Sequence, residues 1–278
     1  MLDNITMVGV FGDKDSGRSV VAKFLQNYYG FTRIGLLDPV RFMVKEVLLL
    51  SGMSDEDIAK DDSHFEPTDS EVYTIQMIKA YYLLTGKEAS TKDLGKFIQL
   101  LYAKLPINEL YKQSVYLVAN KVIRQNNPDT LLSMLTSRVV SLAQENPKAH
   151  YRIVVEDIAT VGEAVFIESF FGTLIKVVKH SPLEKNGSNK VNAEVADAAL
   201  KSIQSMFTVY NTGNIEHVKI ETAAVASVLG LEPVVKLPRG YRKRVPEVLE
   251  SLSRNKAVTD SDNNFLFQFE DDLIQEVV

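Results

Sequence analysis

The feature that most constrains the fold is a short apolar run that passes through a glycine-containing turn into an amphipathic helix. Residues 5–11 are apolar and rich in β-branched side chains, which is typical of a buried strand. Residues 12–17 are turn-forming, and apolar side chains then recur at helical spacing from Arg18 to about Tyr28. A strand that leads directly into a helix begins a β–α unit. This unit predicts a parallel sheet covered by helices.

The same alternation returns later in the chain. Residues 151–156 and 173–178 have the composition of buried strands, with a helical pattern over 162–171 between them. Two shorter strands are expected at 31–36 and 207–211. Further helices are expected over residues 39–50, 71–86, 91–104, 107–125, 129–145 and 215–229. We therefore predict a three-layer α/β fold with a central parallel sheet of about five strands.

The predicted elements suggest one large domain and a tail. Residues 1–230 hold the α/β pattern, interrupted over about 51–146 by a run of helices without strands. From residue 231 onward prolines and glycine punctuate the chain, so we treat 231–278 as a C-terminal appendage. The appendage carries a basic cluster at 239–244, which either binds phosphate or an acidic partner or forms a solvated turn.

Composition excludes several functional classes. The chain of 278 residues has a formal net charge of −5, which gives no overall attraction for nucleic acid. It has no cysteine, so disulfides, thiolate metal sites and cysteine nucleophiles are excluded. Its four histidines are scattered and form no metal-binding motif. No apolar run approaches the ~20 residues of a membrane span, and the N-terminus lacks the basic flank of a signal peptide. We expect a soluble cytoplasmic protein.

The strongest chemical signal lies in the first turn. Residues 12–19 fit the pattern G-x-x-x-x-G-[K/R]-[S/T] between a predicted strand and a predicted helix, the context of a phosphate-binding P-loop. The phosphate-binding residues would be Gly12, Asp13, Lys14, Asp15, Ser16, Gly17, Arg18 and Ser19. Arg18 replaces the usual lysine, and the wide guanidinium is not equivalent to an ammonium, which Lys14 could supply instead. The alternative is an ordinary β–α turn without special chemistry.

A second candidate lies at the end of the strand 151–156. Glu156 and Asp157 follow that strand, and ligands of open α/β sheets bind outside the carboxyl ends of the strands. A carboxylate there can hold the water shell of Mg²⁺ or accept a proton from a substrate. The alternative is that Asp157 only caps the next helix.

Several segments, in order along the chain, carry a resemblance to a known family. The chain resembles the deoxynucleoside monophosphate kinases of bacteriophages, a branch of the P-loop nucleotide kinases. In the first half of the chain, residues 9–28 match the P-loop and its helix, 36–41 a small-x-Pro-[basic] helix start, and 96–102 the pattern R-x-x-x-Q-x-x-G. In the second half, residues 153–163 match a strand and D-x-R-x-x-x-E, and 177–179 match the next strand and its basic end. Glu194 lies at the position of an H-x-[S/T]-E motif, and residues 209–216 match I-x-N-D-G-[S/T]-L-E.

The resemblance implies a fold, a reaction and a set of site residues. It implies a P-loop kinase-like fold whose helical insertion binds the substrate, and ATP-dependent phosphoryl transfer to a (deoxy)nucleoside monophosphate in the host cytoplasm. Three groups of residues would serve this reaction. Arg18, Lys14 and Asp157 would be catalytic, Ser19 and Asp157 would hold Mg²⁺, and Arg41, Lys96 and Gln99 would face the acceptor.

The departures from the family pattern concentrate at positions that would touch phosphate or substrate. They are Arg18 for lysine, Lys96 for arginine, Tyr102 for glycine, Ala159 for arginine and Asn192 for histidine. Loss of a clamping arginine is expensive for phosphoryl transfer. Activity is therefore weakened or lost in this interpretation. A first alternative is a non-catalytic kinase-fold protein with a structural, assembly or partner-binding role in a phage, including a place in the virion. A second is a nucleotide sensor or sponge.

The end of the chain holds a candidate contact with a partner. The segment 247–278 contains the aromatic run Phe265–Phe269, which would either dock on a protein partner or pack on its own core. Oligomerisation remains open from the sequence.

Overall fold

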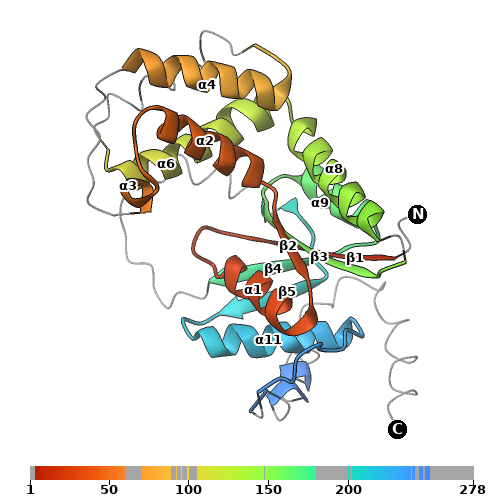
Figure 1. Cartoon of the computed structure of the whole chain (residues 1–278). Helices are drawn as coiled ribbons and strands as arrows, with labels where there is room; N and C mark the ends of the chain where they lie inside the picture. The colour runs from red at the N-terminus through yellow and green to blue at the C-terminus, as the bar shows by residue number, and fades with distance from the viewer. Residues whose placement is uncertain are drawn as a thin grey trace.

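A computed structural model describes residues 4–59, 70–88, 105–146, 148–179 and 202–238, with isolated residues at 92, 95, 99 and 200 and the short pieces 240–241, 244–246 and 248–250. At its centre is a parallel five-stranded sheet in the order β2-β3-β1-β4-β5 (Figure 1). The strands are β1 Ile5–Gly12, β2 Thr32–Gly35, β3 Tyr151–Ile158, β4 Thr173–Lys179 and β5 Phe207–Asn211. The five predicted strands and the α/β fold class are thereby confirmed.

The central strand β1 contributes side chains to both faces of the sheet. Met7 and Phe11 lie in one buried apolar cluster, whereas Val8 and Val10 lie in the other. This alternation follows from the period of two along a strand. Burial on both faces explains why β1 reads as a continuous apolar run rather than as alternating polar and apolar residues. Its carboxyl end lies between the ends of β3 and β4, so the loop that follows it occupies the middle of that edge.

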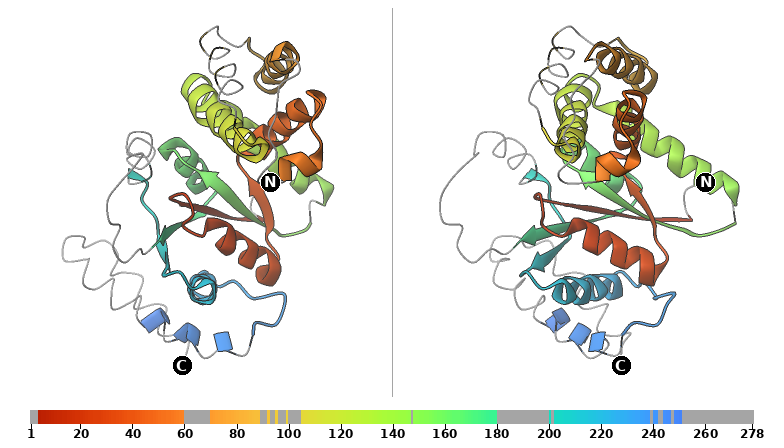
Figure 2. Two further views of the ribbon diagram at one scale, coloured as in Figure 1. Left: turned by 90° about the vertical axis from the view of Figure 1, so that its left-hand side faces the viewer. Right: turned by 60° about the vertical axis from the view of Figure 1, so that its left-hand side comes forward.

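Helices cover both faces, which makes the fold three-layered. One face is covered by α1 (Arg18–Tyr29) and α11 (Ile215–Val228), and the other by α9 (Val161–Ser169), α8 (Asp129–Glu145) and the helical insertion (Figure 2). Buried residues of α1 pack with those of α11 in one cluster, and buried residues of α8 and α9 belong to the other. The predicted three-layer architecture is therefore observed.

The helical insertion is a small bundle on the same side of the sheet as α8 and α9. It comprises α2 (Asp38–Leu50), α3 (Asp55–Ala59), α4 (Ser70–Thr85) and α6 (Ile107–Tyr116), and α2 packs against both α4 and α6. From α6 the chain continues as the π-helical segment η1 (Leu117–Ile123) and the single turn α7 (Arg124–Asn126). The helix predicted over 107–125 thus exists, but its middle is π-helical. Most of the helix predicted over 91–104 lies outside the described residues.

The described part of the predicted appendage packs on the α1–α11 face. The Val234 N–H donates to the Tyr28 carbonyl oxygen at 2.8 Å, and the rings of Tyr241 and Phe24 lie 5.9 Å apart. Val245 and Val248 join the same apolar cluster. Within the described ranges, no helix has the length and apolar character needed to cross a membrane. The boundary at residue 230 stays a prediction.

Candidate functional site

The loop between β1 and α1 has the backbone geometry of an anion-binding turn. Gly12 has φ 149°, and a Cβ added there would lie 2.1 Å from the Val177 carbonyl oxygen, so only glycine fits. Asp15 (φ 60°) and Gly17 (φ 105°) are left-handed, whereas Ser16 between them is not. Residues that alternate in this way turn successive N–H groups toward one concave side, which is a site for anions.

Several N–H groups of this loop are available to a ligand. The Ser16 N–H donates to the Asp13 carbonyl oxygen at 3.2 Å, and the Val20 N–H is the first that returns to the Gly17 carbonyl oxygen, at 2.9 Å. The N–H groups of Gly17, Arg18 and Ser19 belong to the start of α1 and have no backbone acceptor in the described part of the chain. Free N–H groups and the helix dipole together favour a bound phosphate.

The side chains of the loop also leave polar groups without partners. Lys14 and Ser19 are exposed and Arg18 is half-buried, and none of the three makes a hydrogen bond or ion pair within the described residues. The Ser16 hydroxyl is fully buried, yet its Oγ has no hydrogen-bond partner among the described residues. An unsatisfied buried hydroxyl costs about 1–3 kcal/mol. Phosphate oxygens or ordered water bound in this loop would give the Ser16 hydroxyl a hydrogen-bond partner.

A β-bulge shapes the end of β3. The partner of Gly9 is Val155 and that of Phe11 is Ile158, so two residues of β3, Glu156 and Asp157, lie opposite one residue of β1. Asp157 has φ 67°, an unusual conformation for a residue with a side chain. Bulges re-aim side chains and occur often beside active sites.

The bulge brings together two of the predicted site residues, Arg41 and Asp157. Arg41 Nη1 donates to Asp157 Oδ2 at 2.8 Å and to Asp38 Oδ1 at 2.9 Å. Asp38 also accepts from the Gly35 N–H through Oδ2 at 2.7 Å, which fixes the start of α2. Burial alone lowers the pKa of Arg41, but hydrogen bonds and charges from Asp157 and then Asp38 raise it above its usual value. Arg41, which was predicted to face the acceptor substrate, is therefore shared between the carboxylates of Asp157 and Asp38.

A second guanidinium, Arg124, reaches this strand end and was not predicted. Glu163 is buried and Arg124 is half-buried, and the two form a bidentate pair, with Nε–Oε1 at 2.7 Å and Nη2–Oε2 at 3.0 Å. Arg124 Nη2 also donates to the Asp157 carbonyl oxygen at 2.7 Å, and Nη1 to Asn120 Oδ1 at 2.7 Å. Four of its five N–H donors are thus engaged within the protein.

Glu163 is placed by a local signal that the sequence does contain. Thr160 is the N-cap of α9 and accepts from the Glu163 N–H at 3.2 Å, while Glu163 Oε2 accepts from the Thr160 N–H at 3.1 Å. This reciprocal pair is a capping box. Because Thr160 is the N-cap of α9, the alternative prediction that Asp157 caps this helix is wrong. Arg124 follows a π-helical segment, and nothing in the sequence foretells which way its side chain points.

Glu156, the other residue of the bulge, pairs outward toward the edge strand. Its carboxylate accepts from Arg33 Nε and, at 3.3 Å, from Arg33 Nη2. Beside Arg33 lies a hollow of about 290 Å³ between β2, the start of α2 and α8, and the exposed Arg138 lines its far side. Glu156 is thus engaged in a structural ion pair.

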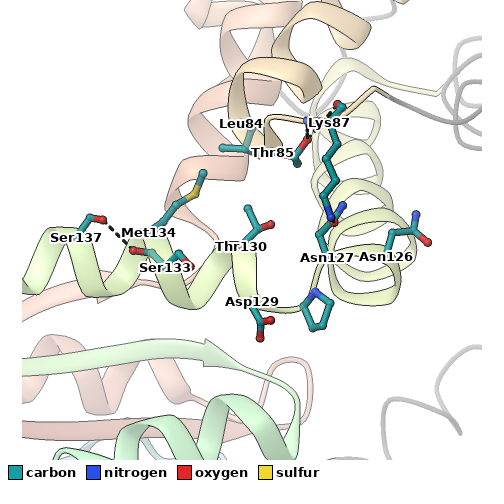
Figure 3. A pocket seen from close by; sticks show the side chains of 11 residues that line it. Leu84, Thr85, Lys87, Asn126, Asn127, Asp129, Thr130, Ser133, Met134 and Ser137 are labelled. Atoms are coloured by element: carbon teal, nitrogen blue, oxygen red, sulfur yellow. Dashed lines mark hydrogen bonds between the residues drawn. The ribbon is translucent and has the colours of Figure 1, made fainter.

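A larger hollow of about 590 Å³ lies next to this one, and Met134 lines both. Its walls come from the end of α4, the turn after α7 and the start of α8 (Figure 3). Its cation Lys87 donates to Asn127 Oδ1, and Asn127 Nδ2 donates to the Tyr81 hydroxyl at 3.2 Å, so these polar groups satisfy one another. None of the predicted site residues lines it. We assign the candidate site to the loop 12–19 and the carboxyl edge of the sheet instead.

The remaining predicted residues lie elsewhere or outside the described ranges. Gln99 is an exposed helical residue, and Lys96 lies outside the described residues. So do Tyr102, Asn192, Glu194, most of the basic cluster 239–244 and the segment 251–278. Among described residues, no three His, Asp or Glu side chains gather to hold a metal ion. Of the two predicted metal ligands, Asp157 has its Oδ2 engaged by Arg41, whereas the Ser19 hydroxyl makes no hydrogen bond within the described residues.

Comparisons with known proteins add a distant structural likeness. No protein-family model and no curated protein matches the chain. Among solved structures, dephospho-CoA kinase from Campylobacter jejuni is similar over 81% of this chain and 98% of that chain, with 13% sequence identity and a TM-score of 0.39. A likeness at this level is too distant to assign a family or a function to the chain.

Proposed function

We propose that the chain binds the phosphates of ATP with loop 12–19 and transfers a phosphoryl group to a (deoxy)nucleoside monophosphate, with reduced activity. The observation that carries this proposal is the alternating backbone of Asp15, Ser16 and Gly17 at the end of the central strand, followed by the free N–H groups at the start of α1. The resemblance to phage deoxynucleoside monophosphate kinases supplies the reaction class and the setting in an infected host cytoplasm.

The loop residues and the acceptor residues divide the work of this reaction. An oxygen of the acceptor phosphate bonds to the γ-phosphorus of ATP, the bond from that phosphorus to the β–γ bridging oxygen breaks, and ADP leaves. N–H groups of residues 13–19 hold the donor phosphates, and Arg18 and Lys14 neutralise their charge. Mg²⁺, held by Ser19 with help from Asp157, supplies further charge neutralisation when bound. Arg41, Lys96 and Gln99 orient the acceptor.

The arrangement of cations explains why we propose reduced activity. Arg41 is bonded to two carboxylates, and Arg124 has most of its donors bonded within the protein. Ala159 stands where the family pattern has an arginine. Among the residues that the structure describes, Lys14 and Arg18 have no ion-pair partner and remain as the cations of the loop itself. Phosphoryl transfer depends on such charges, because catalysis is mainly positioning and neutralisation.

The pairing of Arg41 and Arg124 within the protein supports a second candidate function without catalysis. In this version the Arg41–Asp157 pair is structural, and the chain serves a phage as an assembly or partner-binding protein through residues 247–278, as an oligomer or as part of the virion. A form that binds nucleotides without turnover would act as a sensor or sponge. The partner-binding version and the sensor version both keep the α/β scaffold, and they differ in whether the chain binds phosphate.

A coupled assay with Mg-ATP and the four deoxynucleoside monophosphates tests the kinase. We expect slow turnover with at least one acceptor, abolished by Arg18→Ala and retained in Lys23→Ala, which removes an exposed charge from the same helix. Calorimetry with ATP separates the other versions. Binding without turnover favours the sensor, and absence of both favours the partner-binding protein.

A further inference from the structure

Asn211 links the end of β5 to the loop between β1 and α1. Asn211 Nδ2 donates to the Ser16 carbonyl oxygen at 2.9 Å, although the two residues lie 195 positions apart in the sequence. Asn211 Oδ1 accepts from the Gly213 N–H at 2.9 Å. Because an N–H must meet the oxygen end of the amide, this second bond fixes which end faces Ser16.

The Asn211 side chain is itself held in place by β5. Asn211 is the last residue of that strand and pairs with Lys179 of β4. The preceding Tyr210 N–H donates to the buried Glu221 carboxylate of α11 at 2.5 Å. The loop is therefore attached to a rigid strand end rather than to another loop.

We infer that Asn211 is a positioning residue that aims the Gly17 N–H at a bound phosphate, an inference that rests on the proposed function. The peptide bond between Ser16 and Gly17 is trans, as are all described peptide bonds, so its C=O and N–H point in opposite directions. Asn211 holds the C=O toward β5. The Gly17 N–H consequently points away from Asn211, and in the described part of the chain it has no backbone acceptor, like the N–H groups of Arg18 and Ser19 that follow it.

The space around Gly17 supports this role. A Cβ added to Gly17 would lie 3.0 Å from Asn211 Nδ2, so a side chain there would push the amide away from the Ser16 carbonyl. The Ser16 N–H is already bonded to the Asp13 carbonyl oxygen. The N–H of the Asp15–Ser16 peptide is therefore already bonded. The N–H of the Ser16–Gly17 peptide, which Asn211 fixes, is the one that remains for a ligand.

Replacement of the amide by a carboxylate tests the inference. Asn211→Asp keeps the acceptor for Gly213 but cannot donate to Ser16, and Asn214→Asp places the same new charge in the same loop while still able to cap α11. Calorimetry with inorganic triphosphate should show about tenfold weaker binding for Asn211→Asp than for Asn214→Asp, equivalent to about 1.4 kcal/mol. Asn211→Ser and Asn214→Ser repeat the comparison without added charge.

The Gly17 amide resonance gives a readout that general destabilisation does not move. Triphosphate should shift this resonance in the natural chain and in Asn214→Asp but not in Asn211→Asp, at equal melting temperatures. Equal affinities and equal Gly17 shifts in the Asn211 and Asn214 variants would overturn the inference. A natural chain that binds no triphosphate would overturn the inference together with the phosphate site. Triphosphate binding with the predicted Asn211 effect but no kinase turnover would support the inference and contradict only the kinase.

Discussion

At the scale of single residues, Gly12 is the position where the loop tolerates least. It combines φ 149° with a hypothetical Cβ 2.1 Å from the Val177 carbonyl oxygen. Gly12→Ala should therefore lower the free energy of unfolding by about 1–3 kcal/mol through overpacking, and abolish triphosphate binding. Urea denaturation measures the first effect and calorimetry the second.

Gly52→Ala is the matched control for this prediction. Gly52 also has a positive φ, 93°, but a Cβ there would meet nothing within 4 Å. It should show only the backbone penalty of a left-handed alanine, about 1 kcal/mol, and retain triphosphate binding. Equal effects of the two substitutions would mean that contact with β4 does not constrain the loop.

At the same scale, the sequence predicted where residues lie along the fold better than it predicted what they contact. The motif 12–19 lies where it was predicted, because a strand, a turn and a helix are local signals. The pairing of Arg41 with Asp157 spans 116 positions and depends on a bulge in β3, which the apolar run of that strand does not reveal. Their roles in substrate and metal binding stay predictions.

At the scale of elements, the Arg124–Glu163 pair joins the end of the helical insertion to the start of α9. Both side chains are nearly excluded from solvent, with 8% and 3% of their surfaces exposed. Arg124→Met should lower the free energy of unfolding by about 3–5 kcal/mol, because a buried carboxylate is left without its countercharge. The double variant Arg124→Met, Glu163→Gln should recover much of this loss, as measured in a double-mutant cycle by urea denaturation. Additive effects would contradict a direct coupling.

The contact between α11 and β5 predicts a pH dependence of stability. Burial raises the pKa of Glu221, although the Tyr210 N–H and His217 partly oppose the shift. The folded chain therefore keeps this proton at pH values where the unfolded chain has lost it. The contribution to stability is complete below the ordinary glutamate pKa and is lost as the pH rises through the raised pKa. Melting temperature measured from the usual glutamate range upward should fall less steeply in Glu221→Gln.

Glu216, five residues earlier on the same helix, is the control with the opposite sign. Hydrogen bonds from Lys219 and Tyr241 lower its pKa, so its contribution is present above the ordinary value and is lost as the pH falls through the lowered pKa. Glu216→Gln should flatten the acidic side of the melting-temperature profile. Identical profiles for the two variants would show that Glu221 is not the source of the predicted slope.

Some secondary-structure elements follow from the local sequence, whereas others depend on contacts with distant residues. Strands β3 and β4 were predictable because buried parallel strands are short apolar runs. The π-helical turn η1 was not, since the sequence over 107–125 has an ordinary helical pattern. Buried Val118, Ala119, Val122 and Ile123 of η1 pack in the core, and the segment delivers Arg124 to β3. Such irregular turns are frequent at functional sites.

At the scale of the whole molecule, the core consists of two apolar clusters on opposite faces of the sheet. The cluster around α1 and α11 includes Tyr241, Val245 and Val248, so part of the predicted appendage belongs to the core. The segment 247–278 was predicted either to dock on a partner or to pack on its own core. If residues 251–278 serve only a partner, a chain cut after Glu250 should keep the melting temperature of the full chain.

A cut after Gly230 should instead lower the melting temperature by many degrees. It removes the Val234–Tyr28 hydrogen bond and the ring contact between Tyr241 and Phe24, and it exposes the apolar side of α1. Calorimetric melting of the two truncated chains beside the full chain measures this difference. Size-exclusion chromatography of the longer one should show an unchanged oligomeric state if the removed segment serves only a partner. A large loss of melting temperature in the longer chain would instead mean that residues 251–278 pack on their own core.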